Sequence, residues 1–162
     1  MSILKVCVTS AAIVALTSTS VWAIDNQASW QGFTTVTSRT AACGRLGGTS
    51  INDTAVSIYR PHIAAADTPT FLSQIYTRYA ISFKNTTEST AHQMHGSGKY
   101  AATVINHRAK AFTYGGGTYN LTITPAKIVA TTPYITITGT INNFLNTTGC
   151  NIGIKGAYVK EP

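Results

Sequence analysis

Short runs in which apolar and polar residues alternate recur along the chain, and this alternation restricts its fold more than any other feature. Between residues 134 and 141, Ile135, Ile137 and Ile141 alternate with threonines, and residues 118–124 repeat the pattern with other apolar residues. A period of two places successive side chains on opposite faces of a strand. The pattern therefore predicts half-buried β-strands, each with an apolar face and a threonine face.

Turn-forming residues separate these runs at fairly regular intervals. Charged residues make up only 10% of the chain, against about 25% in ordinary domains, which disfavours long surface helices and coiled coils. The sequence predicts an all-β fold, either an antiparallel β-sandwich or a small closed barrel, of about eight to nine strands. We favour the sandwich. The expected strands lie near residues 30–38, 54–60, 75–83, 100–107, 110–114, 118–124, 134–141 and 151–160, with a ninth segment at 127–130.

Two segments need a separate interpretation. Residues 71–83 fit both helical spacing and alternation, and we expect one strand from about Ile75 after a single helical turn. Three consecutive glycines, residues 115–117, separate two β-like runs. Because glycine supplies the positive φ that tight turns require, this run predicts the tip of a β-hairpin.

A barrel embedded in an outer membrane would show the same alternation. Its strands need about 9–11 residues to span the hydrocarbon layer, and several runs here are shorter. We therefore treat this architecture as a minor alternative.

The first 23 residues have the features of a secretory signal peptide. Lys5 precedes an apolar run of about 11 residues, and small residues precede the expected cleavage site after Ala23. The run is shorter than the ~20 residues that span a bilayer, so we expect no transmembrane span in the mature chain. The expected organisation is a signal peptide at 1–23 and a single secreted β domain at 24–162, in the periplasm, on the cell surface or outside the cell.

Export leaves two cysteines, Cys43 and Cys150, in an oxidising compartment. We expect them to form one disulfide that joins the first part of the fold to the last. A zinc site is the weaker interpretation, because neither cysteine has a nearby Cys or His partner in the sequence.

The chain is basic, with a formal net charge of +7, or +6 once Lys5 is removed. Outside the cytoplasm this charge favours acidic glycans, anionic lipid headgroups, lipopolysaccharide or stray nucleic acid. The cations are scattered, so no specific nucleic-acid partner is expected. The expected partners are a protein or a glycan at the cell surface, with self-assembly as a further option.

One loop contains a candidate metal site. His92, Met94 and His95 lie within four residues, followed by Gly-Ser-Gly. Imidazole suits Cu(II) and a thioether suits Cu(I), so this loop predicts a copper site if the fold supplies a further ligand. A copper-binding protein is therefore an alternative function.

A second alternative is a small basic ribonuclease. One imidazole would remove the 2′-hydroxyl proton, another would protonate the leaving oxygen, and a cation would stabilise the phosphorane. The residues available for these roles are His62, His92, His95, His107, Lys99, Arg108 and Lys110. Paired carboxylates for glycoside hydrolysis are scarce, with Asp53 and Asp67 as the one plausible couple.

Two further features favour binding over catalysis. Outward threonine rows on neighbouring strands can bond sugars, another strand or ordered water, and aromatic side chains can stack on sugar rings. We therefore expect an exported, non-catalytic protein that acts by binding or assembly at the cell envelope or outside the cell. The aromatic candidates are Trp30, Tyr59, Tyr76, Tyr79, Tyr100, Tyr114, Tyr119, Tyr134 and Tyr158.

Overall fold

The computed structural model describes residues 28–61, 71–75, 79–87, 93–106 and 110–162, so the expected signal peptide lies outside the described residues. Within those ranges the chain forms eight strands and two short 3₁₀ helices, neither of which is long enough to cross a membrane. The strands are β1 (Trp30–Arg39), β2 (Thr54–Arg60), β3 (Phe71–Ile75), β4 (Tyr79–Asn85), β5 (Gly96–Asn106), β6 (Lys110–Thr124), β7 (Tyr134–Asn142) and β8 (Ile152–Lys160). The helices are η1 (Ala41–Cys43) and η2 (Phe144–Asn146).

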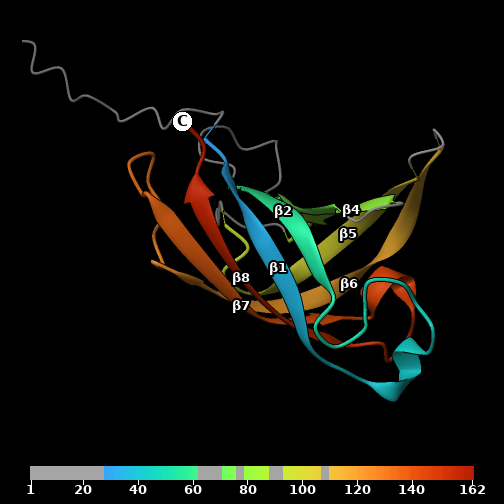
Figure 1. Ribbon diagram of the computed structural model, residues 1–162. Helices are drawn as coiled ribbons and strands as arrows, with labels where there is room; N and C mark the ends of the chain where they lie inside the picture. The colour runs from blue at the N-terminus through green and yellow to red at the C-terminus, as the bar shows by residue number, and fades with distance from the viewer. Residues whose placement is uncertain (1–27, 62–70, 76–78, 88–92, 107–109) are drawn as a thin grey trace, which may run out of the picture.

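The eight strands form a closed antiparallel barrel in which each strand pairs with its neighbours in the sequence. Closure comes from β1 and β8, which pair from Trp30 opposite Lys160 to Arg39 opposite Ile152 (Figure 1). Of the two all-β architectures expected, the barrel is therefore correct and the favoured sandwich is not. Closure removes the unpaired edges that an open sheet would leave.

The inner face of the barrel follows the predicted alternation. On β7, Ile135, Ile137 and Ile141 are buried while the threonines between them are exposed. The same division holds over residues 118–124 of β6, and on β8 Ile152, Ile154 and Tyr158 are also buried. Burial of aliphatic side chains away from water drives this arrangement.

Large aromatic side chains fill much of the interior, and their polar atoms are bonded. Trp30 Nε1 donates to the carbonyl oxygen of Thr132 at 3.0 Å. The hydroxyl of Tyr158 lies 2.5 Å from that of Thr34 and donates to Ser57 Oγ at 3.3 Å. Hydrogen bonds of this kind offset the cost of burying hydroxyl and indole groups. An eight-stranded barrel is narrow enough for side chains alone to fill it.

The expected disulfide between Cys43 and Cys150 is present. It joins Cys43 of η1, which follows β1, to Cys150, which lies two residues before β8. Thr40 strengthens the same junction, because its hydroxyl donates to the carbonyl of Gly149 at 2.6 Å and accepts from Asn151 N at 2.9 Å. The bond therefore fastens one end of the β1–β8 junction.

Residues 71–83 do not form the single strand that we expected. Residues Phe71–Ile75 and Tyr79–Asn85 are two antiparallel strands, paired from Phe71 opposite Lys84 to Ile75 opposite Ala80. Two consecutive strands each alternate with period two, so an alternating pattern by itself does not show where the chain reverses direction.

The glycine run at 115–117 is not a hairpin tip. It lies inside the continuous strand β6, where Tyr100 of β5 is opposite Gly117 but Ala102 is opposite Tyr114. Two residues of β6 therefore face one residue of β5, which is a β-bulge. A Cβ on Gly116 would overlap the carbonyl oxygen of Tyr100, so glycine is required here for close approach of two backbones.

We predict that Gly117→Ala lowers the free energy of unfolding by at least about 2 kcal/mol, the scale of a steric clash in a packed site. The added Cβ would overlap the carbonyl oxygen of Asn142 and would lie 2.7 Å from the hydroxyl of Tyr100. Urea titration followed by tryptophan fluorescence measures the change. Thr122→Ala, at an exposed position of the same strand away from the glycine run, is the control and should change stability by about 0.5 kcal/mol or less. Equal stability of both variants would contradict the bulge.

We predict that replacing Cys43 and Cys150 together by serine lowers stability by ~4–5 kcal/mol in the loop-closure model, because the bridge spans 107 residues of sequence. Thermal unfolding with and without reductant checks this for the wild type and the double variant. Reductant should destabilise the wild type alone. Two free thiols in the native protein would overturn the assignment.

Candidate functional site

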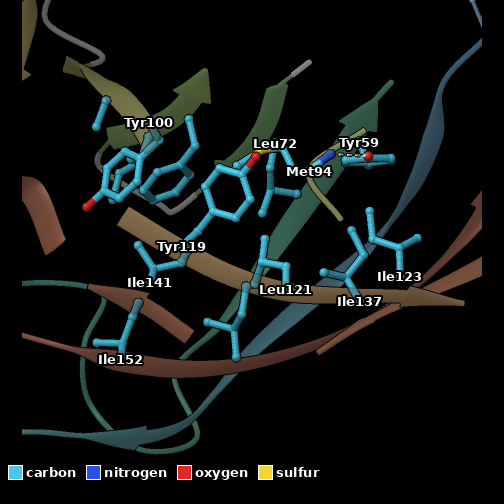
Figure 2. Close-up of a cluster of buried hydrophobic side chains, with 14 of the residues drawn as sticks. Tyr59, Leu72, Met94, Tyr100, Tyr119, Leu121, Ile123, Ile137, Ile141 and Ile152 are labelled. Carbon is cyan, nitrogen blue, oxygen red and sulfur yellow. Dashed lines mark hydrogen bonds between the residues drawn. The ribbon is translucent and has the colours of Figure 1, made fainter. Parts of the chain in front are cut away.

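The structure separates two members of the predicted copper loop. Met94 is buried in the core cluster, and its backbone N donates to the hydroxyl of Tyr59 at 3.2 Å (Figure 2). His95 is exposed, and its Nδ1 accepts a hydrogen bond from Ile123 N at 3.0 Å. His92 lies outside the described residues. The described residues contain no group of three His, Cys, Asp or Glu side chains placed to hold a metal, and the copper site stays a prediction.

The residues of the predicted ribonuclease cannot be placed together either. His62, His92, His107 and Arg108 lie outside the described residues. Lys99 lies on β5, where it lines the groove described below. The ribonuclease therefore also stays a prediction.

Most of the aromatic residues that we considered for stacking on sugars are inside the barrel. Five of them are buried, namely Trp30, Tyr59, Tyr100, Tyr119 and Tyr158. Tyr134 is 65% exposed and stands on the outer face of β7. An aromatic platform built from most of these residues is therefore wrong for the described part of the chain.

An open groove lies on the outer wall, across strands β5, β6 and β7. Its volume is about 520 Å³, and the described residues that line it carry hydroxyl, amide and ammonium groups and no carboxylate. The lining residues are Thr87, Ser97, Gly98, Lys99, Thr118, Tyr119, Asn120, Thr140 and Asn142. We call this feature the polar groove.

Strand pairing places the polar groove residues in two adjacent rows. Lys99 is opposite Thr118, which is opposite Asn142. Ser97 is likewise opposite Asn120, the partner of Thr140 on β7. Alternation along each strand turns all of these side chains outward, so the groove follows directly from the outward polar face that the sequence predicts.

The backbone around Lys99 is fixed on one side by the segment that follows β4. Lys99 N donates to Thr87 Oγ1 at 2.6 Å, and Thr86 N donates to the carbonyl of Lys99 at 2.9 Å. Across the groove, Asn142 Nδ2 donates to Thr118 Oγ1 at 3.2 Å. These bonds hold the backbone in place while the Lys99 side chain remains exposed.

Tyr100 connects the groove wall to the barrel interior. Its hydroxyl donates to the carbonyls of Asn142 and Asn143, at 3.0 and 3.1 Å. The contact crosses β6 at Gly117, which has no side chain to block the ring. The bulge, the glycines and Tyr100 therefore together set how β6 and β7 meet beside the groove.

Among the described residues, two lysines lie at the polar groove. Lys84 of β4 is opposite Ala101, two residues from Lys99 on the same outer face, so the two lysines are diagonal neighbours ~7–8 Å apart. The side-chain carboxylates of the described residues are those of Asp53 and Glu161. Asp53 accepts from Ser50 N at 2.9 Å, and Glu161 accepts from the Ser29 hydroxyl. Neither carboxylate lines the groove.

No protein-family model, curated protein or solved structure matches this chain. The site therefore has to be interpreted from its own chemistry.

Sequence reasoning identified only part of the polar groove. It placed Thr118, Asn120 and Thr140 on outward faces, but it considered Lys99 only as a cation for RNA cleavage and did not single out Asn142. These residues are adjacent only because of the register in which β5, β6 and β7 pair. That register depends on the bulge opposite Ala101, which the sequence analysis interpreted as a turn.

We predict that stability is lost at alkaline pH as the buried tyrosines ionise. Burial raises the pKa of Tyr59, Tyr100, Tyr119 and Tyr158 above the ordinary value. Because the pKa is higher in the folded state, this stabilisation is complete below the unfolded value of about 10 and is lost as the pH rises above it. Urea titrations across that range, with tyrosinate absorbance recorded in parallel, measure the effect. Ionisation of all eight tyrosines near pH 10 while the protein stays folded would contradict it.

Proposed function

We propose that this protein is an exported, non-catalytic binding protein, and that its polar groove binds an acidic glycan at the cell envelope or outside the cell. The observation that supports this most directly is the described lining of the groove, which combines several hydroxyl and amide groups with the ammonium group of Lys99.

Side chains already fill the interior of the barrel. Many large residues, including Trp30, Tyr59 and Tyr100, have less than 2% of their surface exposed. Such packing resembles the close-packed interior of ordinary domains. We therefore assign binding to the outer wall.

The chemistry of the polar groove suits a polyhydroxylated ligand that carries negative charge. Threonine and serine hydroxyls donate and accept, and asparagine amides do both, as sugar hydroxyls require. Lys99 supplies donors only, so it favours a carboxylate or sulfate group over a neutral hydroxyl. Lys84 nearby and the net charge of +7 add a longer-range attraction for acidic polymers.

Calorimetric titration with an acidic and a neutral polysaccharide tests the proposal. We predict that the acidic polymer binds and that added salt weakens it, because salt screens exposed charges. Lys99→Gln should weaken binding about fivefold to tenfold, which corresponds to ~1–1.4 kcal/mol. Asn120→Ala should weaken it further through a lost hydrogen bond.

Lys127→Gln is the matched control, since it removes the same charge from an exposed residue outside the groove. It should leave the affinity nearly unchanged. An equal loss in Lys127→Gln and Lys99→Gln would mean that only net charge matters. No binding of either polysaccharide by the wild type would refute the glycan proposal.

A further inference from the structure

The three most exposed large apolar side chains of the described residues lie on neighbouring strands. Tyr134 on β7 is 65% exposed, Val159 on β8 is 64% exposed and Phe33 on β1 is 59% exposed. Tyr134 is directly opposite Val159. Phe33 is two residues from Gln31, the partner of Val159, and is thus its diagonal neighbour. Diagonal neighbours are within reach of aromatic side chains.

The same patch continues onto β2 and β3. Phe33 is opposite Ala157 on one side and Val56 on the other, and Val56 is opposite Ile75. Val56 and Ile75 are 37% and 38% exposed, and Ala157 is exposed too. We call the patch formed by Phe33, Val56, Ile75, Tyr134, Ala157 and Val159 the apolar patch. Contiguous exposed apolar surface of this kind marks an interaction site more often than scattered single residues do.

Positive charge borders the apolar patch. Lys155 lies two residues from Ala157 on the outer face of β8, opposite Thr35 and Thr138. Lys160 does not belong to this border, because it is opposite the inward Trp30 at the rim of the barrel. The carboxylate nearest in sequence, Glu161, accepts a hydrogen bond from the Ser29 hydroxyl. An aromatic and aliphatic surface with a lysine at its margin suits the boundary between lipid headgroups and acyl chains.

We propose that the apolar patch docks this protein onto an anionic lipid surface, with Phe33, Tyr134 and Val159 entering the headgroup region and Lys155 facing the lipid phosphates. This surface is separate from the polar groove, so the proposal does not depend on glycan binding. Charge complementarity selects the partner. A second copy of this chain would bring like-charged lysines together, whereas anionic lipid would neutralise them.

Sedimentation of the protein with vesicles of phosphatidylcholine, with and without phosphatidylglycerol, tests the proposal. The full chain is expressed in a host that secretes proteins, and the secreted protein is purified for these measurements. The wild type should bind the vesicles that contain phosphatidylglycerol and should bind less as salt increases. Phe33→Ser with Val159→Ser should reduce binding at least about thirtyfold, through lost apolar burial. Lys155→Gln should reduce it about fivefold on anionic vesicles alone.

Ile51→Ser is the matched control, because Ile51 is 57% exposed but lies in the turn before β2, outside the apolar patch. It should bind vesicles as the wild type does. Phe33 and Val159 are exposed, so their variant should keep the wild-type circular dichroism, thermal unfolding and polysaccharide binding. If Lys99→Gln loses polysaccharide binding but still binds vesicles, that result reports on the polar groove and leaves the lipid proposal standing.

Three outcomes would overturn the lipid proposal. One is a wild type that does not sediment with anionic vesicles, and another is an equal loss in Ile51→Ser. The third is a wild-type dimer in light scattering that becomes monomeric in the Phe33 and Val159 variant, since that result would assign the patch to a second copy of the chain.

Discussion

The pairing of β1 with β8 is the contact on which the rest of the structure depends. These strands lie at opposite ends of the described chain, and only their pairing converts a row of hairpins into a barrel. Both ends of the junction are fastened. The disulfide and Thr40 hold one end, while Lys160 N donates to Pro133 O at 2.8 Å and Glu161 N to Ser29 O at 2.9 Å at the other. Without this closure, β1 and β8 would expose unpaired backbone groups to water and to other chains.

Closure also determines where the protein can act. A barrel of eight strands encloses a narrow space, and in this protein aromatic and aliphatic side chains occupy it. The outer wall then carries two surfaces of different chemistry. The polar groove lies on β5, β6 and β7, whereas the apolar patch begins on β7 and continues across β8 and β1. The proposed glycan and the proposed lipid surface would therefore contact different residues of one small domain.

Where one face of a strand is apolar and the other is threonine, as on β7, alternation alone predicted which residues face the core. On β2 it did not, because Ser57 is buried whereas Val56 is 37% exposed. The choice between sandwich and barrel was not available locally, since both need the same alternation and differ only in whether β1 meets β8. The prediction of a hairpin tip at residues 115–117 was wrong for a related reason. Turns and bulges both favour glycine, and only the position of Tyr100 on the neighbouring strand distinguishes the two.

Because Trp30 is opposite Lys160, the first and last strands start and finish at the same rim of the barrel, as Figure 1 shows for β1 and β8. A short peptide linker joining these two ends would cross only a small gap. The chain is thus suited to circular permutation, with new termini opened in an exposed part of the connection between β1 and β2, such as Gly44–Arg45. In such a permutant the Cys43–Cys150 bond would keep its place in the barrel but would join residues at a different separation along the chain. Its contribution to stability could then be compared for two loop lengths in one fold.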